Sequence, residues 1–124
     1  MNITPTAIED VLVLVPQIHG AHRGYFMETW RKSELESLGI KTGFVQDNQS
    51  RSVQKTLRGL HYQLDHPQAK LVRVIAGEIF DVVVDLRKNS KTFGKWIFIE
   101  LSKSNRKILW VPKGFAHGYY TLSD

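Results

Sequence analysis

The sequence contains no cysteine among its 124 residues. This absence excludes a disulfide framework and thiolate chemistry. No apolar run approaches the roughly eighteen residues that a membrane span needs. The N-terminus, MNITPTAIED, also lacks the basic and apolar regions of a signal peptide. We therefore expect a cytoplasmic protein without a membrane partner.

Basic residues outnumber acidic ones by 17 to 12, and the formal net charge is +5. Such a charge favours a polyanionic partner, either nucleic acid or a phosphorylated small molecule. The basic residues are spread along the chain without a run of five or more, which favours the small molecule. We expect no nucleic-acid partner, and a gel-shift experiment with short DNA tests that expectation.

Short β-strand patterns dominate, and glycine, proline or polar clusters separate most of them. We expect strands over residues 8–15, 22–30, 44–51, 56–63, 70–75, 78–86, 96–101, 107–111 and 116–122. One helix is expected over residues 33–39, with Ser33 as its N-cap and Gly39 as its stop. Many short strands with one helix predict a single all-β domain over residues 1–124, built as a sandwich or barrel.

The strand expected over residues 78–86 alternates apolar and polar side chains. Its apolar residues occupy the even positions, while Asp81 and Asp85 lie on the opposite face. This is the pattern of a half-buried antiparallel strand. The sequence then stops at Asp124, directly after the last strand. A complete barrel is expected to close its sheet edge, so we expect the chain to lack its C-terminal part.

Residues 112–117, Pro-Lys-Gly-Phe-Ala-His, fit the pattern Pro-x-Gly-x-x-His, the core of the second cupin motif. Proline and glycine set a turn that launches a strand, and His117 points into the barrel. The alternative is an ordinary turn followed by a structural histidine.

The first cupin motif is present in altered form. Residues 61–63, His-Tyr-Gln, replace its His-x-His, and Lys70 stands in the place of its glutamate. A metal site needs neutral imidazoles and carboxylates that converge on one point. Because Lys70 would repel a cation from that point, we expect no metal.

An ammonium beside an imidazole suits removal of a proton next to a carbonyl group. His61 is the candidate base, and Lys70 is the candidate donor to the enolate oxygen that forms. The alternative for Lys70 is a solvated charge on a strand.

Further polar residues lie on the predicted strands. Arg23 and Arg58 have planar forks that could bind a diphosphate. Gln46 and Asn48 are two residues apart and face the same way. Glu28 could accept hydrogen bonds from sugar hydroxyls or a base edge. Taken singly, each is more often a surface or structural residue.

Several strings together resemble the dTDP-4-dehydrorhamnose 3,5-epimerase family, a group of cupins. The resemblance runs from about residue 5 to the end. It rests on residues 23–26 (RGYF), 44–48 (FVQDN), 57–63 (LRGLHYQ), 69–74 (AKLVRV), 77–87 (GEIFDVVVDLR), 92–96 (TFGKW) and 110–118 (WVPKGFAHG).

The resemblance implies a cupin jelly roll of antiparallel strands, a homodimer and no metal or organic cofactor. It implies inversion of C3 and C5 of dTDP-4-dehydro-6-deoxy-glucose on the way to dTDP-rhamnose. His61 then matches the family's base and Lys70 its enolate-stabilising lysine. The substrate-binding positions match Arg23, Glu28, Gln46, Asn48, Arg58 and His117, with part of the nucleotide site built at the dimer interface.

In the family, a tyrosine acts as the acid on the opposite face of the sugar, and an aspartate orients the base. The resemblance places both residues beyond residue 124. Two alternatives therefore stay open beside the two-centre epimerase. One is a related enzyme that epimerises one carbon or isomerises the ketone. The other is a catalytically incomplete module that binds sugar nucleotides or dimerises.

Overall fold

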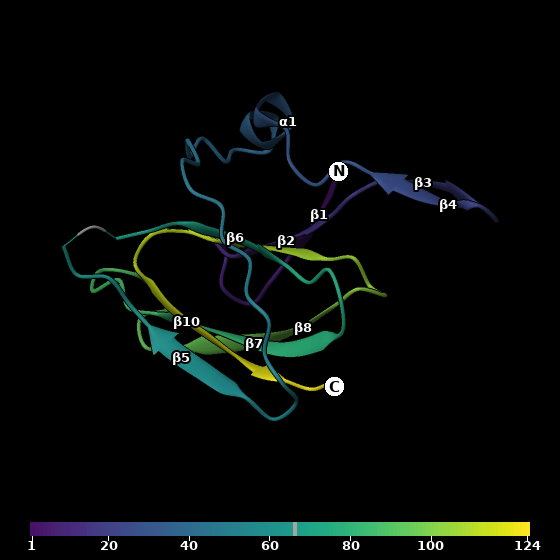
Figure 1. The fold of residues 1–124 in the computed structure, drawn as a ribbon. Coiled ribbons are helices and arrows are strands. Elements are labelled where there is room, and N and C mark those ends of the chain that lie inside the picture. The colour runs from purple at the N-terminus through teal and green to yellow at the C-terminus, as the bar shows by residue number, and fades with distance from the viewer. Residues whose placement is uncertain (66) are drawn as a thin grey trace.

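The computed structural model describes residues 1–65 and 67–124. In these residues two four-stranded antiparallel sheets lie one above the other, as the layers of Figure 1 show. The first sheet has the order β1-β2-β9-β6, and the second has the order β5-β10-β7-β8. The elements are β1 (Asn2–Pro5), β2 (Leu12–Val15), β3 (Ile18–Ala21), β4 (Gly24–Met27), α1 (Lys32–Ser37), β5 (Leu57–His61), β6 (Lys70–Arg73), β7 (Glu78–Asp85), β8 (Trp96–Ser102), β9 (Ile108–Val111) and β10 (Phe115–Thr121). The predicted antiparallel all-β fold with one short helix is confirmed.

The main core lies between the two sheets. Alternate residues of each strand face inward, so that Val13, Leu109 and Val111 of the first sheet meet Val83 and Phe115 of the second. A second cluster covers the outer face of the first sheet. There α1 packs above β2 and β9, and the buried members are Leu14, Leu35, Ile40, Ile108 and Trp110.

Both ends of α1 can be compared with the prediction. The helix begins at Lys32, and its N-cap is Arg31, which makes no side-chain cap hydrogen bond. The prediction that Ser33 caps the helix is therefore wrong. The prediction of a stop at Gly39 is confirmed: Gly39 has a φ of +88°, and the N–H of Ile40 donates to the carbonyl of Leu35 at 2.9 Å. This is a Schellman ending, in which glycine adopts the left-handed conformation without strain.

Three parts of the chain differ from the predicted strands. Residues 44–51 form no regular strand, although Phe44 packs edge-on against Trp110 with ring centroids 6.0 Å apart. The predicted strand over residues 8–15 is reduced to β2, which pairs with the unpredicted β1. The predicted strand over residues 22–30 is reduced to β4, which forms a hairpin with the unpredicted β3.

The hairpin β3–β4 projects from the two sheets in Figure 1, on the far side from β5. Arg106 lies over the ring of Tyr25, with 4.0 Å between the guanidinium carbon and the ring centroid. This cation–π contact ties the hairpin to the loop between β8 and β9. No helix in the described residues is long and apolar enough to cross a membrane.

The faces of β7 are the reverse of those that its sequence pattern indicated. Asp81, Val83 and Asp85 are buried, whereas Val82 and Val84 are only partly buried. The even face points outward toward Trp96 and Phe98 of β8. The alternation was recognised correctly, but the interior holds the acidic face because both carboxylates find partners there.

The partners of Asp85 form a closed network at the end of β7. The guanidinium of Arg87 donates to both carboxylate oxygens at 3.0 Å, and the hydroxyl of Ser90 donates at 2.6 Å. Thr92 also donates a hydroxyl hydrogen bond. Arg87 continues to the exposed Asp10 at 2.6 Å. Burial works to raise the pKa of Asp85, but these donors outweigh it and hold that pKa far below its usual value.

Candidate active site

A bulge in β5 places two predicted site residues on the same face of the sheet. His61 pairs with His117 of β10, and Arg58 pairs with Tyr119. Three steps along β5 therefore correspond to two steps along β10, which is one extra residue in β5. Side chains three apart on a regular strand face opposite sides. The bulge instead turns both Arg58 and His61 toward the side of His117.

Glycines make the bulge possible. Gly59 has a φ of +105°, and a Cβ at this position would lie 2.6 Å from the Cα of Gly118. A Cβ at Gly118 would in turn lie 2.6 Å from the carbonyl oxygen of Arg58. The two backbones approach so closely only because neither residue has a side chain. The close approach of β5 to β10 thus explains why glycine follows arginine in the Arg-Gly-Leu-His string, independently of the family resemblance.

His117 is buried and bonded to an unpredicted partner. Its Nε2 lies 2.8 Å from Oδ2 of Asp81, which is fully buried. Among the described residues, Oδ1 of Asp81 has no hydrogen-bond partner. Burial raises the pKa of Asp81, and the contact with His117 and the charge of Lys70 oppose that rise. The carboxylate is therefore held in a desolvated site with spare acceptor capacity.

Lys70 enters the same region from the other sheet. It is the first residue of β6 and pairs with the inward-facing Val111 of β9, so its side chain shares the interior face. Burial lowers the pKa of the Lys70 ammonium, and the nearby Asp81 carboxylate opposes this. The alternative of a fully solvated charge is not supported, because Lys70 is half-buried.

A cavity of about 980 Å³ adjoins this group. Its wall includes His117, Gln46 and Asn48, together with residues 71–73 of β6. Gln46 Nε2 donates to Asn48 Oδ1 at 3.3 Å. The two side chains therefore lie on the same side, as predicted, although residues 44–51 form no strand. His61 and Lys70 are not among the residues that line the cavity. His61 is the register partner of His117, and Lys70 is close to Asp81, which is bonded to His117.

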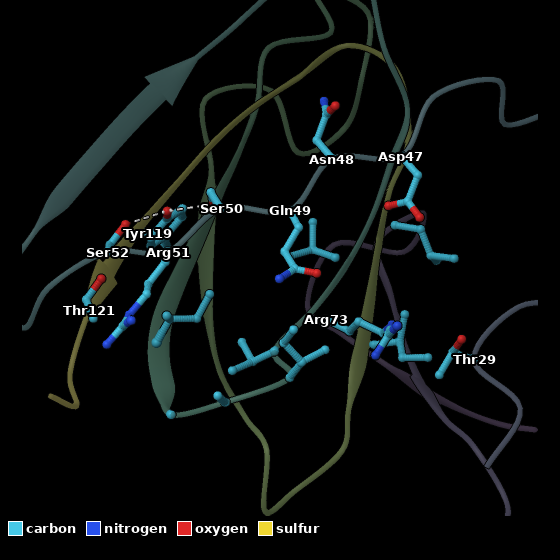
Figure 2. A pocket seen from close by; sticks show the side chains of 18 of the residues that line it. Thr29, Asp47, Asn48, Gln49, Ser50, Arg51, Ser52, Arg73, Tyr119 and Thr121 are labelled. Atoms are coloured by element: carbon cyan, nitrogen blue, oxygen red, sulfur yellow. Dashed lines mark hydrogen bonds between the residues drawn. The ribbon is translucent and has the colours of Figure 1, made fainter. Parts of the chain in front are cut away.

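Figure 2 shows the polar part of this cavity. Ser50, Ser52 and Tyr119 lie together at one end, while Asp47, Arg73 and Thr29 lie at the other. Arg58 joins the first group by donating from Nε to Ser52 Oγ at 2.9 Å. Ser52, which lines the cavity, therefore holds the predicted diphosphate-binding arginine beside it.

Arg23 and Glu28 are not among the residues that line this cavity, although Thr29, which follows Glu28, is. Arg23 lies between the two strands of the projecting hairpin, and Glu28 directly follows β4. Glu28 forms an ion pair with Arg31 at 2.9 Å on the surface.

No group of three metal-ligating side chains gathers within residues 1–65 and 67–124. The interior site pairs one carboxylate with one imidazole and adds an ammonium. The absence of a metal stays a prediction.

Sequence reasoning missed Asp81 and Tyr119. The alternation in residues 78–86 places Asp81 on the face opposite the apolar residues. The sequence feature that could have indicated its burial is its position directly before a run of valines. Tyr119 lies two residues after His117 and so shares its face. No sequence motif indicates a role for Ser50 and Ser52, because their hydrogen-bond partner Tyr119 is distant along the chain.

Comparison with known proteins gives the family. The sequence profile of the dTDP-4-dehydrorhamnose 3,5-epimerase family matches residues 5–124. The chain belongs to this family. The dTDP-4-dehydrorhamnose 3,5-epimerase of Shigella flexneri is 52% identical over 126 residues, which cover 100% of this chain and 70% of the relative. The resemblance seen in the sequence, the fold and the isomerase class are thereby confirmed.

Solved structures of the epimerase family agree. The enzyme of Legionella pneumophila, in complex with dTDP-4-keto-L-rhamnose, superposes with a TM-score of 0.95 at 51% identity, covering 98% of this chain and 65% of that one. The epimerase of Bacillus anthracis, with TDP and PPi bound, gives a TM-score of 0.94 at 46% identity over 98% of this chain and 71% of that one. The chain thus spans about two thirds of its relatives' length.

Proposed function

We propose that this chain carries the proton-abstraction site of an epimerase that acts on dTDP-4-dehydro-6-deoxy-glucose, inverting C3 and C5 to give dTDP-4-dehydrorhamnose in dTDP-rhamnose biosynthesis. His61 is the base and Lys70 stabilises the enolate. The observation that carries the proposal is the half-buried Lys70 ammonium, which shares the interior with the pair formed by His117 and Asp81. His61 is the register neighbour of that pair.

The energetics explain why both groups are needed. An imidazole has a pKa near 6.5. A carbon acid next to a ketone is weaker by about a dozen pK units, each worth roughly 1.36 kcal/mol. His61 takes the proton, and the C–H electron pair moves into the carbonyl group to form an enolate. A preorganised positive donor at that oxygen supplies much of the missing free energy. Return of a proton to the opposite face then inverts the carbon.

Lys70 fits the donor role because its surroundings are poor in water. Burial makes the ammonium less stable and strengthens its interaction with a new negative charge. Asp81 works in the other direction and keeps the ammonium charged before the substrate binds. The substrate is already ketonic, so the proposed step needs no oxidant or reductant.

Solvent-deuterium exchange at C3 and C5 of the 4-keto substrate tests the proposal. We expect exchange at both carbons in the unaltered protein and a loss of about 100-fold to 10,000-fold in His61→Asn. Lys70→Met is expected to lose exchange similarly, while the matched control Lys103→Met, at an exposed position, is expected to keep it. dTDP binding is expected to survive in every variant.

The same experiment separates the alternatives. Exchange at both carbons without inversion would indicate a catalytically incomplete form of the site. Exchange at C3 alone would indicate a single-site epimerase. A protein that binds dTDP but exchanges neither carbon would be a binding module, and the epimerase proposal for this chain would fail.

Within the single chain, we propose that Arg58, Gln46, Asn48 and His117 bind the substrate. What supports this is that Gln46, Asn48 and His117 line one cavity, and that Arg58 is bonded to Ser52 in its wall. For Arg23 and Glu28 we propose contact with substrate held by a second copy of the chain. What supports this for Arg23 is its place in the turn between β3 and β4, the hairpin that projects from the two sheets, and Glu28 directly follows that hairpin.

A homodimer is part of the proposal. The outer face of the second sheet carries Trp96 and Phe98, which are 60% and 54% exposed. Phe98 stacks on Phe80 at 4.7 Å, so the apolar surface is continuous across two strands. Monomers rarely expose such patches. Light scattering of the protein is expected to give twice the chain mass, and a monomer mass at micromolar concentration would contradict this.

We further propose that residues 1–124 act as one domain, in the cytoplasm and without nucleic acid as partner. Supporting the last point, the basic residues are spread along the chain without a run of five or more. Salt-sensitive binding to short DNA would contradict it.

A further inference from the structure

Tyr119 lies in a cluster of hydroxyl and guanidinium groups that no motif predicted. Its Oη shares a hydrogen bond with Ser52 Oγ at 3.0 Å and a longer one with Ser50 Oγ at 3.4 Å. Arg58 Nε donates to the same Ser52 Oγ at 2.9 Å. Figure 2 shows Tyr119, Ser50 and Ser52 together at one end of the cavity. The phenol thus joins an irregular segment to β10, and Arg58 joins the same segment to β5.

Two features of the fold place the phenol there. The β5 bulge makes Arg58, rather than a neighbour, the register partner of Tyr119. Residues 44–52 form no regular strand, so the backbone ladder that would hold such a segment in place is missing there. In the described part of the chain, Tyr119 is the side chain that bonds to both serines.

The cluster is built to receive an anion. All four groups can donate hydrogen bonds, and Arg58 adds a positive charge. Arg58 bonds to Ser52 through Nε, so N–H groups of its terminal nitrogens remain to donate to an anion. Partial burial works to raise the pKa of the Tyr119 phenol, but the serine hydrogen bonds and the Arg58 charge outweigh it and lower that pKa. A more acidic phenol is a stronger hydrogen-bond donor.

We propose that Tyr119 is a positioning residue for the diphosphate of the sugar nucleotide: it fixes Ser50 and Ser52, and through Ser52 it orients the Arg58 guanidinium. This inference rests on the proposed function and deepens it. Its physical content is preorganisation, because an exposed arginine that is already held in its binding geometry loses less conformational freedom when the anion arrives.

Tyr119→Phe tests the inference, because it removes only the hydroxyl group. Tyr120→Phe is the matched control: this neighbouring residue pairs with Leu57 and Phe80 and faces the outer side. We expect Tyr119→Phe to weaken the binding of dTDP and of inorganic pyrophosphate by about fivefold to tenfold, as measured by titration calorimetry. KM is expected to rise by the same factor with kcat within about twofold, and Tyr120→Phe is expected to change neither.

A double-mutant cycle separates positioning from a loss of packing. Ser52→Ala is expected to match the loss in Tyr119→Phe, and the double variant is expected to lose little more, because the residues act through one chain of hydrogen bonds. Additive losses would overturn the inference, as would wild-type pyrophosphate binding in Tyr119→Phe. A fall in kcat with unchanged KM would also overturn it, by making Tyr119 a proton donor instead. Failure of the unaltered protein to bind dTDP would instead count against the proposed function.

Discussion

Asp81 and Asp85 stand on the same face of β7, and both have 0% relative exposure. Asp85 is saturated by donors from Arg87, Ser90 and Thr92, and its pKa is lowered. Within residues 1–65 and 67–124, Asp81 has only the contact of Oδ2 with His117, and its pKa is raised. The strand thus carries one carboxylate that the fold has fully satisfied and another that it has left partly unsatisfied. The first stabilises the fold, and the second lies at the proposed site of chemistry.

The largest expected effect is on the satisfied carboxylate. Asp85→Ala leaves the Arg87 guanidinium without its buried partner, and losses of this type cost about 3–5 kcal/mol in unfolding free energy. Asp10→Ala removes the exposed partner of the same guanidinium, and we expect it to cost less than about 1 kcal/mol. Urea unfolding of the two variants measures both. Equal losses would mean that burial of Asp85 contributes nothing.

The second effect sharpens the comparison by changing Asp81. Asp81→Asn keeps the shape and the acceptor for His117, so we expect no loss of unfolding free energy at neutral pH. We do expect a fall of about tenfold in exchange rate, since Lys70 loses the carboxylate that keeps it charged. The alkaline limb of the rate profile is expected to move to lower pH. An unchanged profile would show that Asp81 does not act on Lys70.

The smallest effect is the pH dependence of stability, and its sign differs between the two residues. The folded pKa of Asp85 lies below the unfolded value of about 3.9, so its contribution is present above that pH and is lost as the pH falls further. The folded pKa of Asp81 lies above the unfolded value. The native state then binds the extra proton, and stability decreases as the pH rises through that window.

Urea titrations from about pH 2 to pH 7 measure this contrast, with slopes of at most about 1.4 kcal/mol per pH unit. Relative to the unaltered protein, Asp81→Asn is expected to gain stability as the pH rises, and Asp85→Asn is expected to lose it. Slopes of the same sign would remove the distinction between the two carboxylates.

The sequence predicted the parts of the molecule that depend on local patterns. The alternation of β7, the stop at Gly39 and the turn before His117 all follow from short-range physics. What it could not predict depends on distant partners. The inward face of β7 is set by His117 and by the β7–β8 loop, which supply partners for its two aspartates. In the sequence alone, an apolar outer face cannot be distinguished from a face that packs in the core.

The site shows the same division. Motif spacing identified His61, Lys70 and His117, and family membership supports the chemistry proposed for them. Tyr119 could not be found in this way, because its role depends on serines more than sixty residues away along the chain. Neither could the separation of Arg23 from the site, since only the structure shows the hairpin leaving the body of the fold.

The extra residue in β5 makes the site sensitive to insertion and deletion. His61 and Arg58 differ by an odd number of positions, and a single added residue turns that odd separation into a shared orientation. Removing Leu60 would leave Arg58 and His61 two positions apart, which is a shared face on a regular ladder, so both orientations would survive while the local bend and twist of the bulge would be lost. Deletion of Leu60 would therefore test the bend of β5 separately from the orientation of its two side chains, which no substitution can do.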